Sequence, residues 1–349
     1  MKKIIALLLA LSMIAVLSAC GGSKTESKGE VNVYNWGEYI DEDIFDDFEE
    51  QTGIKVNYST YESNETLYSI LKTGGSSYDV IIPSDYMISR LISEDMLEKI
   101  NFDNVPNFSL IDPAYKNLEY DPSGEYSVPY TWGTVGLIYN GDVVQEDVTS
   151  WSIMFDPQYA GQILMFDNSR DAMGIALKYL GYNQNTTDEA QLREAFDLLV
   201  QQKSILQAYV MDQIFDKMES GEAAIAPYYA GDYLVMVENN PSLKYVLPEE
   251  GSNLFVDAMC IPKGAENKEN AEAFINFMCD TDIALANSEV TGYAPAGTEA
   301  MKIFSEDLDE DLYPVINPDK DVLANCDVFT NLPQETLDLY DSLWVDLKS

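Results

Sequence analysis

The sequence contains no histidine among its 349 residues. This absence excludes Ser-His-Asp and Cys-His catalysis, general bases built on imidazole, and metal sites with histidine ligands. A functional site on this chain must therefore use other polar groups, of which the 60 carboxylates and the 23 tyrosine phenols are abundant.

Cysteine is also scarce, and its spacing matches no zinc motif. Beyond Cys20 only Cys260, Cys279 and Cys326 remain, far apart and without a C-x-x-C pattern. Three cysteines allow at most one disulfide. Because Cys260 lies in an apolar run and Cys279 ends a helical pattern, buried free thiols are predicted for them.

Basic residues are few: 20 lysines and arginines face 60 aspartates and glutamates, a formal net charge of −40. A field of this sign repels nucleic acid and anionic lipid and attracts small cations, so no nucleic-acid partner is expected. Acidic runs such as residues 306–311 also fit a solvated surface, so the charge by itself identifies no ligand.

The only long apolar run lies at the N-terminus. A basic start at residues 1–3 precedes an apolar stretch over residues 4–17, two small residues at 18–19, and then Cys20. This order predicts a secretory signal. The cysteine after the small pair resembles a bacterial lipobox, in which Cys20 carries a lipid. An ordinary cleaved signal peptide that happens to end at a cysteine is the alternative.

The lipobox interpretation fixes the expected location. Residues 1–19 would be removed, Cys20 would hold the protein at the extracytoplasmic face of the cell membrane, and residues 20–30, which are polar and unpatterned, would form a flexible tether. No later stretch is long enough to span a bilayer.

The rest of the chain predicts two α/β units. In the first, strand patterns at residues 31–34, 54–58 and 80–82 alternate with helical patterns around residues 44–48, 67–71 and 88–92, which favours a buried parallel sheet. After an extended aromatic stretch at 126–139, the second unit has elements at residues 163–166, 172–180, 190–199, 213–218 and 223–226. Further elements follow at residues 255–261, 270–278 and 333–347.

Two such units joined by extended segments predict an α/β fold of two lobes. Each lobe is expected to be a mixed sheet flanked by helices, with the ligand in the cleft between them. We place the first lobe at residues 31–133 and 258–300, and the second at residues 134–257 and 301–349.

Aromatic residues and carboxylates gather at the predicted strand ends, where open α/β sheets bind ligands. Rings and carboxylates occur together in residues 34–39, 83–86, 227–232 and 255–257. Residues 130–132 and 291–293 add further rings, and residues 167–171 add two carboxylates. One tyrosine at such a place usually belongs to the core. The whole set suits a flexible organic cation, because rings pack against methylene groups and carboxylates pair with buried ammonium groups.

Five segments resemble the spermidine/putrescine-binding proteins, the substrate-binding subunits of polyamine ATP-binding-cassette (ABC) importers. They are YNWGEY at residues 34–39, YSTYESNE at 58–65, YDVIIPS at 78–84, YSVPYTWG at 126–133 and FVDAM at 255–259. The similarity extends over residues 31–348. It implies a two-lobed periplasmic-binding-protein-like fold of type II, capture of a polyamine, delivery to permease subunits, and neither a cofactor nor catalysis.

The resemblance also implies which side chains hold the ligand. Rings, a hydroxyl and a carboxyl group are expected in the cleft from Trp36, Tyr39, Ser84, Tyr86, Asp257 and Tyr293. Among them, Asp257 matches the carboxylate that grips one amine.

Five other implied site positions need separate comment. Asp171 stands where the family has a glutamate, and Asn168 stands where an aspartate is expected, with Asp167 beside it as a substitute. Tyr229 and Phe255 occupy positions of tryptophans and keep a π face. These differences leave open which polyamine is preferred.

Two other functions stay open at this point. The adjacent phenols of Tyr228 and Tyr229 resemble those of two-lobed ferric-ion-binding proteins. Paired carboxylates also serve glycoside hydrolysis. A tyrosinate–iron complex would absorb visible light, and a glycosidase would release product.

Mass spectrometry of the mature protein tests the N-terminal interpretation. We expect a chain that begins at Cys20 and carries the added mass of a lipid on that residue. A chain that begins there without lipid would support the ordinary signal peptide instead, and retention of residues 1–19 would contradict both.

Overall fold

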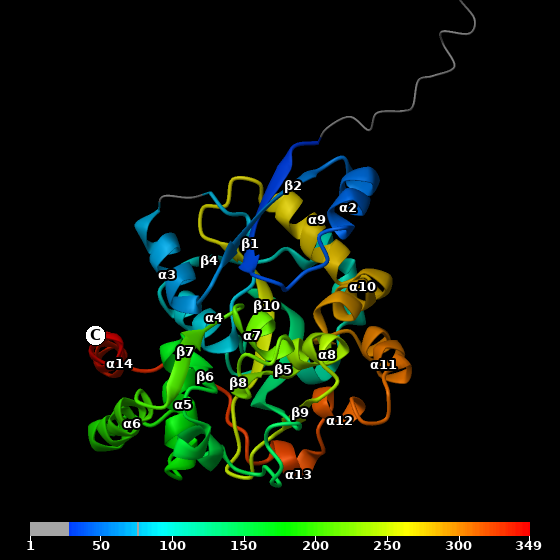
Figure 1. Ribbon diagram of the computed structural model, residues 1–349. Helices are drawn as coiled ribbons and strands as arrows, with labels where there is room; N and C mark the ends of the chain where they lie inside the picture. The colour runs from blue at the N-terminus through cyan, green and yellow to red at the C-terminus, as the bar shows by residue number, and fades with distance from the viewer. Residues whose placement is uncertain (1–27, 75–76) are drawn as a thin grey trace, which may run out of the picture.

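A computed structural model describes residues 28–74 and 77–349, so the predicted signal, the lipidation site Cys20 and most of the tether lie outside the described residues. Within the described part, the strands form one mixed sheet in the order β2-β1-β3-β10-β5-β8-β6-β7. The predicted α/β class is therefore confirmed, and Figure 1 shows helices on both sides of this sheet.

The N-terminal third follows the predicted alternation. Its parallel strands are β1 (Glu30–Trp36), β2 (Lys55–Tyr61) and β3 (Val80–Ile81). The helices between and after them are α2 (Ile44–Thr52), α3 (Asn64–Thr73) and α4 (Asp85–Ser93). Gly53, with φ 77°, ends α2 in the left-handed conformation that glycine tolerates.

A second parallel group lies further along the chain. It consists of β6 (Ile163–Phe166), β7 (Leu206–Val210) and β8 (Ile225–Tyr229). Its helices are α5 (Ser169–Tyr179), α6 (Glu189–Gln202), α7 (Ile214–Glu219) and α8 (Ala230–Asn239).

Two antiparallel strands join these groups. Residues 127–134 of β5 (Ser127–Asn140) pair with β10 (Leu254–Pro262), and residues 135–140 pair with β8 and β9 (Leu243–Val246). On its other edge β10 pairs with β3 and with β4 (Leu97–Glu98), and β11 (Ala294–Pro295) adds to β5. Both halves are thus anchored to the same long strand.

The remaining helices cover the ends and sides. They are α9 (Lys268–Met278), α10 (Thr281–Thr291), α11 (Thr298–Asp307), α12 (Tyr313–Ile316), α13 (Lys320–Leu323) and α14 (Gln334–Lys348). Short 3-10 turns occupy Phe102–Asn104, Pro106–Leu110, Pro113–Tyr115, Trp151–Phe155 and Pro157–Tyr159. None of the helices in the described part of the chain has the length and apolarity needed to cross a membrane.

Buried side chains form three clusters that divide the molecule. Two of them draw on residues 31–132 and 254–296, and we call the part built on them the first lobe. The third draws on residues 135–246 and on the C-terminal helices, and we call that part the second lobe. In Figure 1 the first lobe is uppermost and the second lies below it.

Three residues that were expected in the second lobe pack in the first-lobe clusters. Phe255 and Val256, expected in the second lobe, pack in the first-lobe clusters, because β10 is one continuous strand paired with β3 and β5. Phe329, also expected in the second lobe, packs with the first. The exact lobe boundaries stay a prediction.

Phe329 belongs to a segment, residues 325–332, that we call the strap. Its backbone at Asp327 bonds to Ser252 and Leu254, at 2.8 and 3.0 Å. The buried ammonium of Lys178 in α5 pairs with the Asp327 carboxylate at 2.7 Å. The strap is therefore tied both to β10 and to the second lobe.

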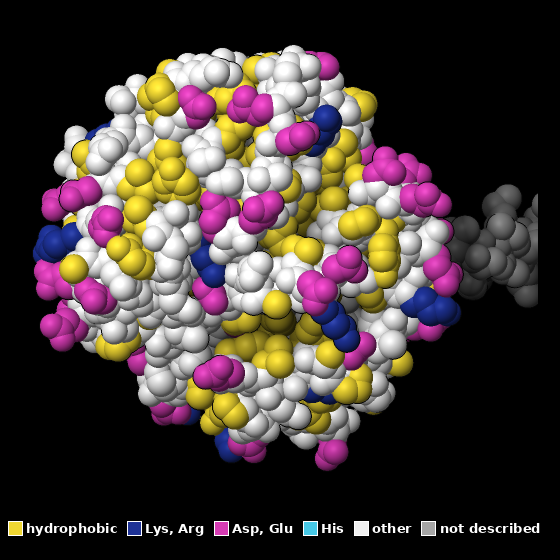
Figure 2. All heavy atoms as spheres, turned by 90° about the horizontal axis from the view of Figure 1, so that it is seen from below, with side chains coloured by type: hydrophobic (Ala, Val, Ile, Leu, Met, Phe, Trp, Pro, Cys, Tyr) yellow, Lys and Arg dark blue, Asp and Glu magenta, His cyan; other side chains and the backbone are white. Residues whose placement is uncertain are grey.

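The cysteine expectation is met where the structure describes these residues. Cys260 and Cys279 are buried, Cys326 is half-buried, and all three thiols are free. The outer surface carries the predicted acidity: Figure 2, which views the second-lobe end, shows acidic side chains scattered over a face that is hollowed near its centre.

The first-lobe core gives a stability prediction. Phe274 of α9 is fully buried, with ring centroids 5.4 Å from Phe48 and 6.5 Å from Phe45 of α2. Phe274→Ala removes this packing and leaves a cavity, so we expect a loss of about 3–5 kcal/mol in the free energy of unfolding. Chemical denaturation measures it. Val345→Ala, at a position 67% exposed, is the control and should change little; equal effects would contradict the packing analysis.

Candidate functional site

One cavity of about 720 Å³ lies between the lobes and is lined by side chains from both. Ten of the lining residues are aromatic: Trp36, Tyr39, Tyr61, Tyr86, Phe215, Tyr228, Tyr229, Phe255, Tyr293 and Phe329. Seven are acidic: Glu38, Glu62, Asp85, Asp171, Asp212, Asp232 and Asp257. No lysine or arginine of the described residues lines it.

Strand ends and helix starts bring these acids together. Asp85, Asp171 and Asp232 lie in the first turns of α4, α5 and α8, where the helix dipole favours a negative charge. Asn168 caps α5, because its side-chain oxygen accepts from the backbone N–H groups of Arg170 and Asp171. The acids are therefore held by rigid elements that converge on the cleft.

Asp257 on β10 is almost completely buried, and its two oxygens differ. Oδ2 accepts a hydrogen bond from the Tyr39 hydroxyl at 2.7 Å. Oδ1 is buried and has no partner among the described residues. The Tyr39 hydroxyl also contacts Thr131 Oγ1, which fixes the ring's position. Asp257 thus has one oxygen, Oδ1, that can accept a hydrogen bond from a molecule in the cavity.

Asp171 repeats this pattern from the second lobe. Its Oδ2 accepts from Asn168 Nδ2 at 2.8 Å and from the Tyr229 hydroxyl at 3.1 Å. Its Oδ1 is buried without a partner in the described part of the chain. Because buried polar atoms are normally bonded, each of these two oxygens is available to accept a hydrogen bond from a molecule in the cavity.

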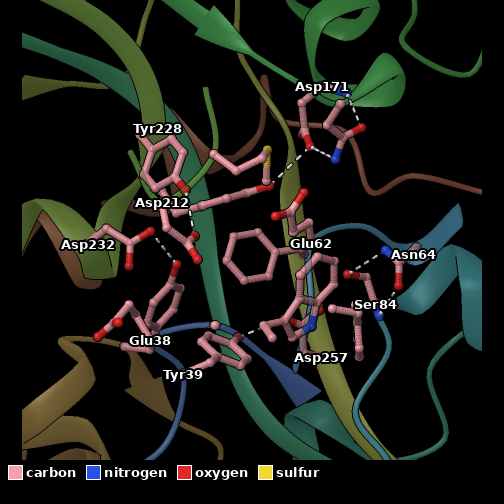
Figure 3. Close-up of a pocket in the computed structure, with 18 of the residues that line it drawn as sticks. Glu38, Tyr39, Glu62, Asn64, Ser84, Asp171, Asp212, Tyr228, Asp232 and Asp257 are labelled. Carbon is pink, nitrogen blue, oxygen red and sulfur yellow. Dashed lines mark hydrogen bonds between the residues drawn. The ribbon is translucent and has the colours of Figure 1, made fainter. Parts of the chain in front are cut away.

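Rings separate the acids. Tyr293 donates to Asp232 Oδ2 at 2.9 Å and meets Tyr39 edge-on, with centroids 4.7 Å apart. Phe255 lies between Tyr229 and Tyr293, at 5.5 and 6.2 Å. In Figure 3 Asp171 lies at one end of the view, Asp232 and Glu38 at the opposite end, with rings between them.

Burial raises the pKa of the enclosed acids. Desolvation lifts the pKa of Asp257 to about 6, although hydrogen bonds from Tyr39 and Ser84 oppose the rise, and that of Asp171 to about 7, although a hydrogen bond from Tyr229 opposes it. Desolvation also lifts the pKa of Asp85 to about 8 and that of Asp232 well above its usual range. Asp171 and Asp257 therefore titrate near neutral pH, and a cation in the cavity would favour their charged forms.

Ten of the eleven predicted cleft residues line the cavity: Trp36, Tyr39, Ser84, Tyr86, Asn168, Asp171, Tyr229, Phe255, Asp257 and Tyr293. Asp167 does not, so its suggested role as a substitute acid is not supported. β6 ends at Phe166, and Asn168 turns inward to cap α5. The carboxylate of Asp167 therefore points to α14, where it pairs with Lys348 at 2.8 Å. The Asp167 side chain is 44% exposed.

Other lining residues were not predicted. Five of them lie within segments that the sequence analysis named, so taking every polar residue of those segments would have included them. They are Glu38, Glu62, Asn64, Asp85 and Asp232. Asp212 and Phe329 lie in loops far from those segments. No local pattern marks either of them.

The hydroxyls of the adjacent tyrosines meet different acids. The Tyr228 hydroxyl approaches Asp212 at 3.5 Å, whereas that of Tyr229 donates to Asp171 at 3.1 Å. Burial, followed by the charges of nearby aspartates, raises the pKa of both phenols well above its usual value. This arrangement gives no support to the ferric-ion alternative.

Comparison with known proteins gives consistent matches. Residues 43–311 match the family model described as bacterial extracellular solute-binding protein. The chain is 35% identical over 318 residues to the spermidine/putrescine-binding periplasmic protein of Escherichia coli K12, covering 90% of this chain and 91% of that protein.

Solved structures agree. A structure from Listeria monocytogenes whose name refers to a spermidine/putrescine ABC transporter has a TM-score of 0.86 at 38% identity, covering 91% of this chain and 98% of that one. The Tp0655 (TpPotD) lipoprotein of Treponema pallidum has a TM-score of 0.80 at 29% identity, covering 91% and 99%.

The raised pKa of Asp171 predicts how stability depends on pH. Its folded value of about 7 exceeds its ordinary value of 3.8, so the folded state binds the proton more tightly. The contribution of protonated Asp171 to the free energy of unfolding is therefore fully present below about pH 4 and is lost as pH rises through 7. Asp171→Asn should make the ligand-free protein more stable at pH 8, by about 1–3 kcal/mol, and change little at pH 4.

Thermal unfolding of both proteins across this range measures the difference. The control is Asp167→Asn, which also removes a carboxylate but at an exposed ion pair worth little. An Asp171→Asn protein that is less stable than the parent at pH 8 would contradict the assignment of a costly buried charge.

Proposed function

The chain belongs to the family of bacterial extracellular solute-binding proteins, and from that premise we propose that it captures a polyamine, spermidine or putrescine, and delivers it to an ABC permease for uptake. The observation that carries the proposal is a pair of buried carboxylate oxygens, Asp171 Oδ1 and Asp257 Oδ1, which accept no hydrogen bond from the described residues and face a cavity that no described lysine or arginine lines. Ammonium groups at two points of a flexible chain would satisfy both.

The energies favour such a ligand. An ammonium about 4 Å from a carboxylate gains roughly 4 kcal/mol at an effective dielectric of 20. Each ring face that meets a desolvated cation adds about 2 kcal/mol. Between charged ends, methylene groups would pack on Phe255, Tyr229 and Tyr293, whose rings stand in sequence through the cavity. A metal ion or a neutral sugar would use only part of this surface.

Capture would need no covalent chemistry. The lobes share only a few chain crossings, and both contribute acids to one cavity, so a hinge motion would open and enclose the site. Binding an ammonium would favour ionised Asp171 and Asp257 and release the protons that burial retains. We therefore propose a receptor that acts by closure and not an enzyme.

Location follows from the N-terminal motif. We propose that a lipid on Cys20 tethers the receptor to the extracytoplasmic face of the membrane, close to the permease. Support comes from the lipobox-like order of residues 17–20 and from the similarity to a protein named as a lipoprotein in Treponema pallidum.

Isothermal titration with spermidine, spermine and putrescine tests the function directly. We expect binding of at least one of them, and Asp257→Asn should weaken it tenfold or more (about 1.4 kcal/mol), because the amide can no longer neutralise an ammonium. The matched control is Asp167→Asn, which has the same change of charge outside the cavity and should bind as the parent does.

Each result has a distinct meaning. No heat and no thermal shift with any of the three amines would contradict polyamine capture. Normal affinity in Asp257→Asn would remove that residue from the site while leaving the function intact. If both variants bound polyamine equally weakly, the effect would come from the net negative charge of the protein and not from a specific contact.

A further inference from the structure

Arg170 is a buried basic side chain beside the cavity, and the proposed function does not use it. It lies in the first turn of α5 in the second lobe and is 2% exposed, yet it is not among the residues that line the cavity. A guanidinium buried this deeply needs partners, because an uncompensated buried charge is costly.

Its hydrogen-bond partners are neutral and come largely from the strap. Nη1 and Nη2 donate to the carbonyl oxygen of Thr330 at 3.4 and 3.5 Å, and Nη2 donates to Asn185 Oδ1 at 3.3 Å. Nε is buried without a partner among the described residues. These long bonds hold the strap, but they do not balance the charge.

Aromatic rings complete the surroundings of Arg170, and they come from three parts of the fold. Its Cζ lies 4.6 Å from the ring centroid of Phe329 in the strap, 4.9 Å from that of Tyr86 in the first lobe, and 5.5 Å from that of Tyr340 in α14. Ring faces attract a desolvated cation. Tyr86 and Phe329 also pack edge-on, 5.9 Å apart, and both line the cavity.

The charge of Arg170 has a second effect, on the acids that the two lobes bring together. The Tyr86 hydroxyl donates to Glu65 Oε1 at 3.0 Å in the first lobe, and Asp171 follows Arg170 in the second. Burial raises the pKa of Glu65, Asp85 and Asp171, and the charge of Arg170 opposes the rise in each. An internal cation thus offsets part of the repulsion between acids of opposite lobes.

We propose that Arg170 is a positioning residue for closure: its guanidinium joins Tyr86 of the first lobe to the strap behind the cavity and supplies the counter-charge that lets the acids of the two lobes approach, without contacting the ligand. The proposal rests on the proposed function for its ligand but not for its effect on the empty protein.

Binding kinetics separate this role from simple electrostatics. Arg170→Met keeps the approximate volume and removes the charge. If Arg170 only repelled a cationic ligand, its loss would speed association and tighten binding. If it holds the closed arrangement, spermidine should dissociate about tenfold faster while association changes little. Stopped-flow fluorescence, with Trp36 in the cavity as reporter, measures both rates.

Two further variants complete the series. Arg170→Lys keeps the charge but loses the planar group that stacks on rings, so an intermediate dissociation rate is expected. The matched control is Arg193→Met: Arg193 pairs with Glu189 at 2.8 Å, with both residues in α6 of the second lobe and outside the cavity, and its removal should leave both rates unchanged.

Folding failure and functional failure are distinguished as follows. Tyr340→Leu removes one of the rings around the Arg170 guanidinium, at a position outside the cavity. If Arg170→Met does not fold, Tyr340→Leu should still speed dissociation, though by less. Unchanged dissociation in every folded variant, or tighter binding in Arg170→Met, would overturn the closure role.

If the parent protein binds no polyamine, the proposed function fails, and small-angle scattering of the empty proteins decides the closure role alone. Arg170→Met should then be more open than the parent. Identical scattering would reject the proposal.

Discussion

The structure depends on the cost of burying carboxylates that the protein leaves incompletely paired. Asp171 and Asp257 face one cavity from opposite lobes, each with one oxygen bonded to a tyrosine hydroxyl and the other without a hydrogen bond from the described residues. Because an unpaired buried charge is heavily penalised, this arrangement is stable only if the acids take up protons or a cation enters. The same constraint that makes the empty cavity unfavourable gives the ligand its binding energy.

The rest of the fold supplies the rigidity that this cost requires. Asp171 stands in the first turn of a helix whose start is capped by Asn168. Asp257 stands on β10, whose residues 254–260 pair with β5, with a shift in register directly after Asp257. Tyr39 is held at its hydroxyl by Asp257 and Thr131. Acids on mobile loops would turn to water and lose the preorganisation that makes a buried contact strong.

The sequence predicted what depends on local order and failed where distant segments meet. Strand β6 was predicted at its observed bounds, Ile163–Phe166. The end of α2 was predicted from Gly53, a glycine being suited to the left-handed conformation that the structure shows there. Asp167 was expected at the cleft but pairs with Lys348 outside it. The backbone between the end of β6 and the start of α5 decides which of Asp167 and Asn168 faces the cleft, and the sequence does not show that geometry. Phe329 reaches the cavity only because the strap crosses β10, and no periodicity records such a crossing.

Charge balance limits which acids the proposed ligand would neutralise. Seven carboxylates line the cavity, more than the positive charges of a diamine or triamine. Glu38, Glu62 and Asp212 at the rim are exposed, so water can solvate their charges. Asp85 is occupied by the backbone N–H groups of Tyr86 and Val256, and burial raises its pKa to about 8, so it is largely neutral near pH 7. Burial also raises the pKa of Asp232 well above its usual range, and Tyr293 occupies its Oδ2, so Asp232 is set aside with Asp85. The buried acids that remain are Asp171 and Asp257, a number that a diamine can neutralise.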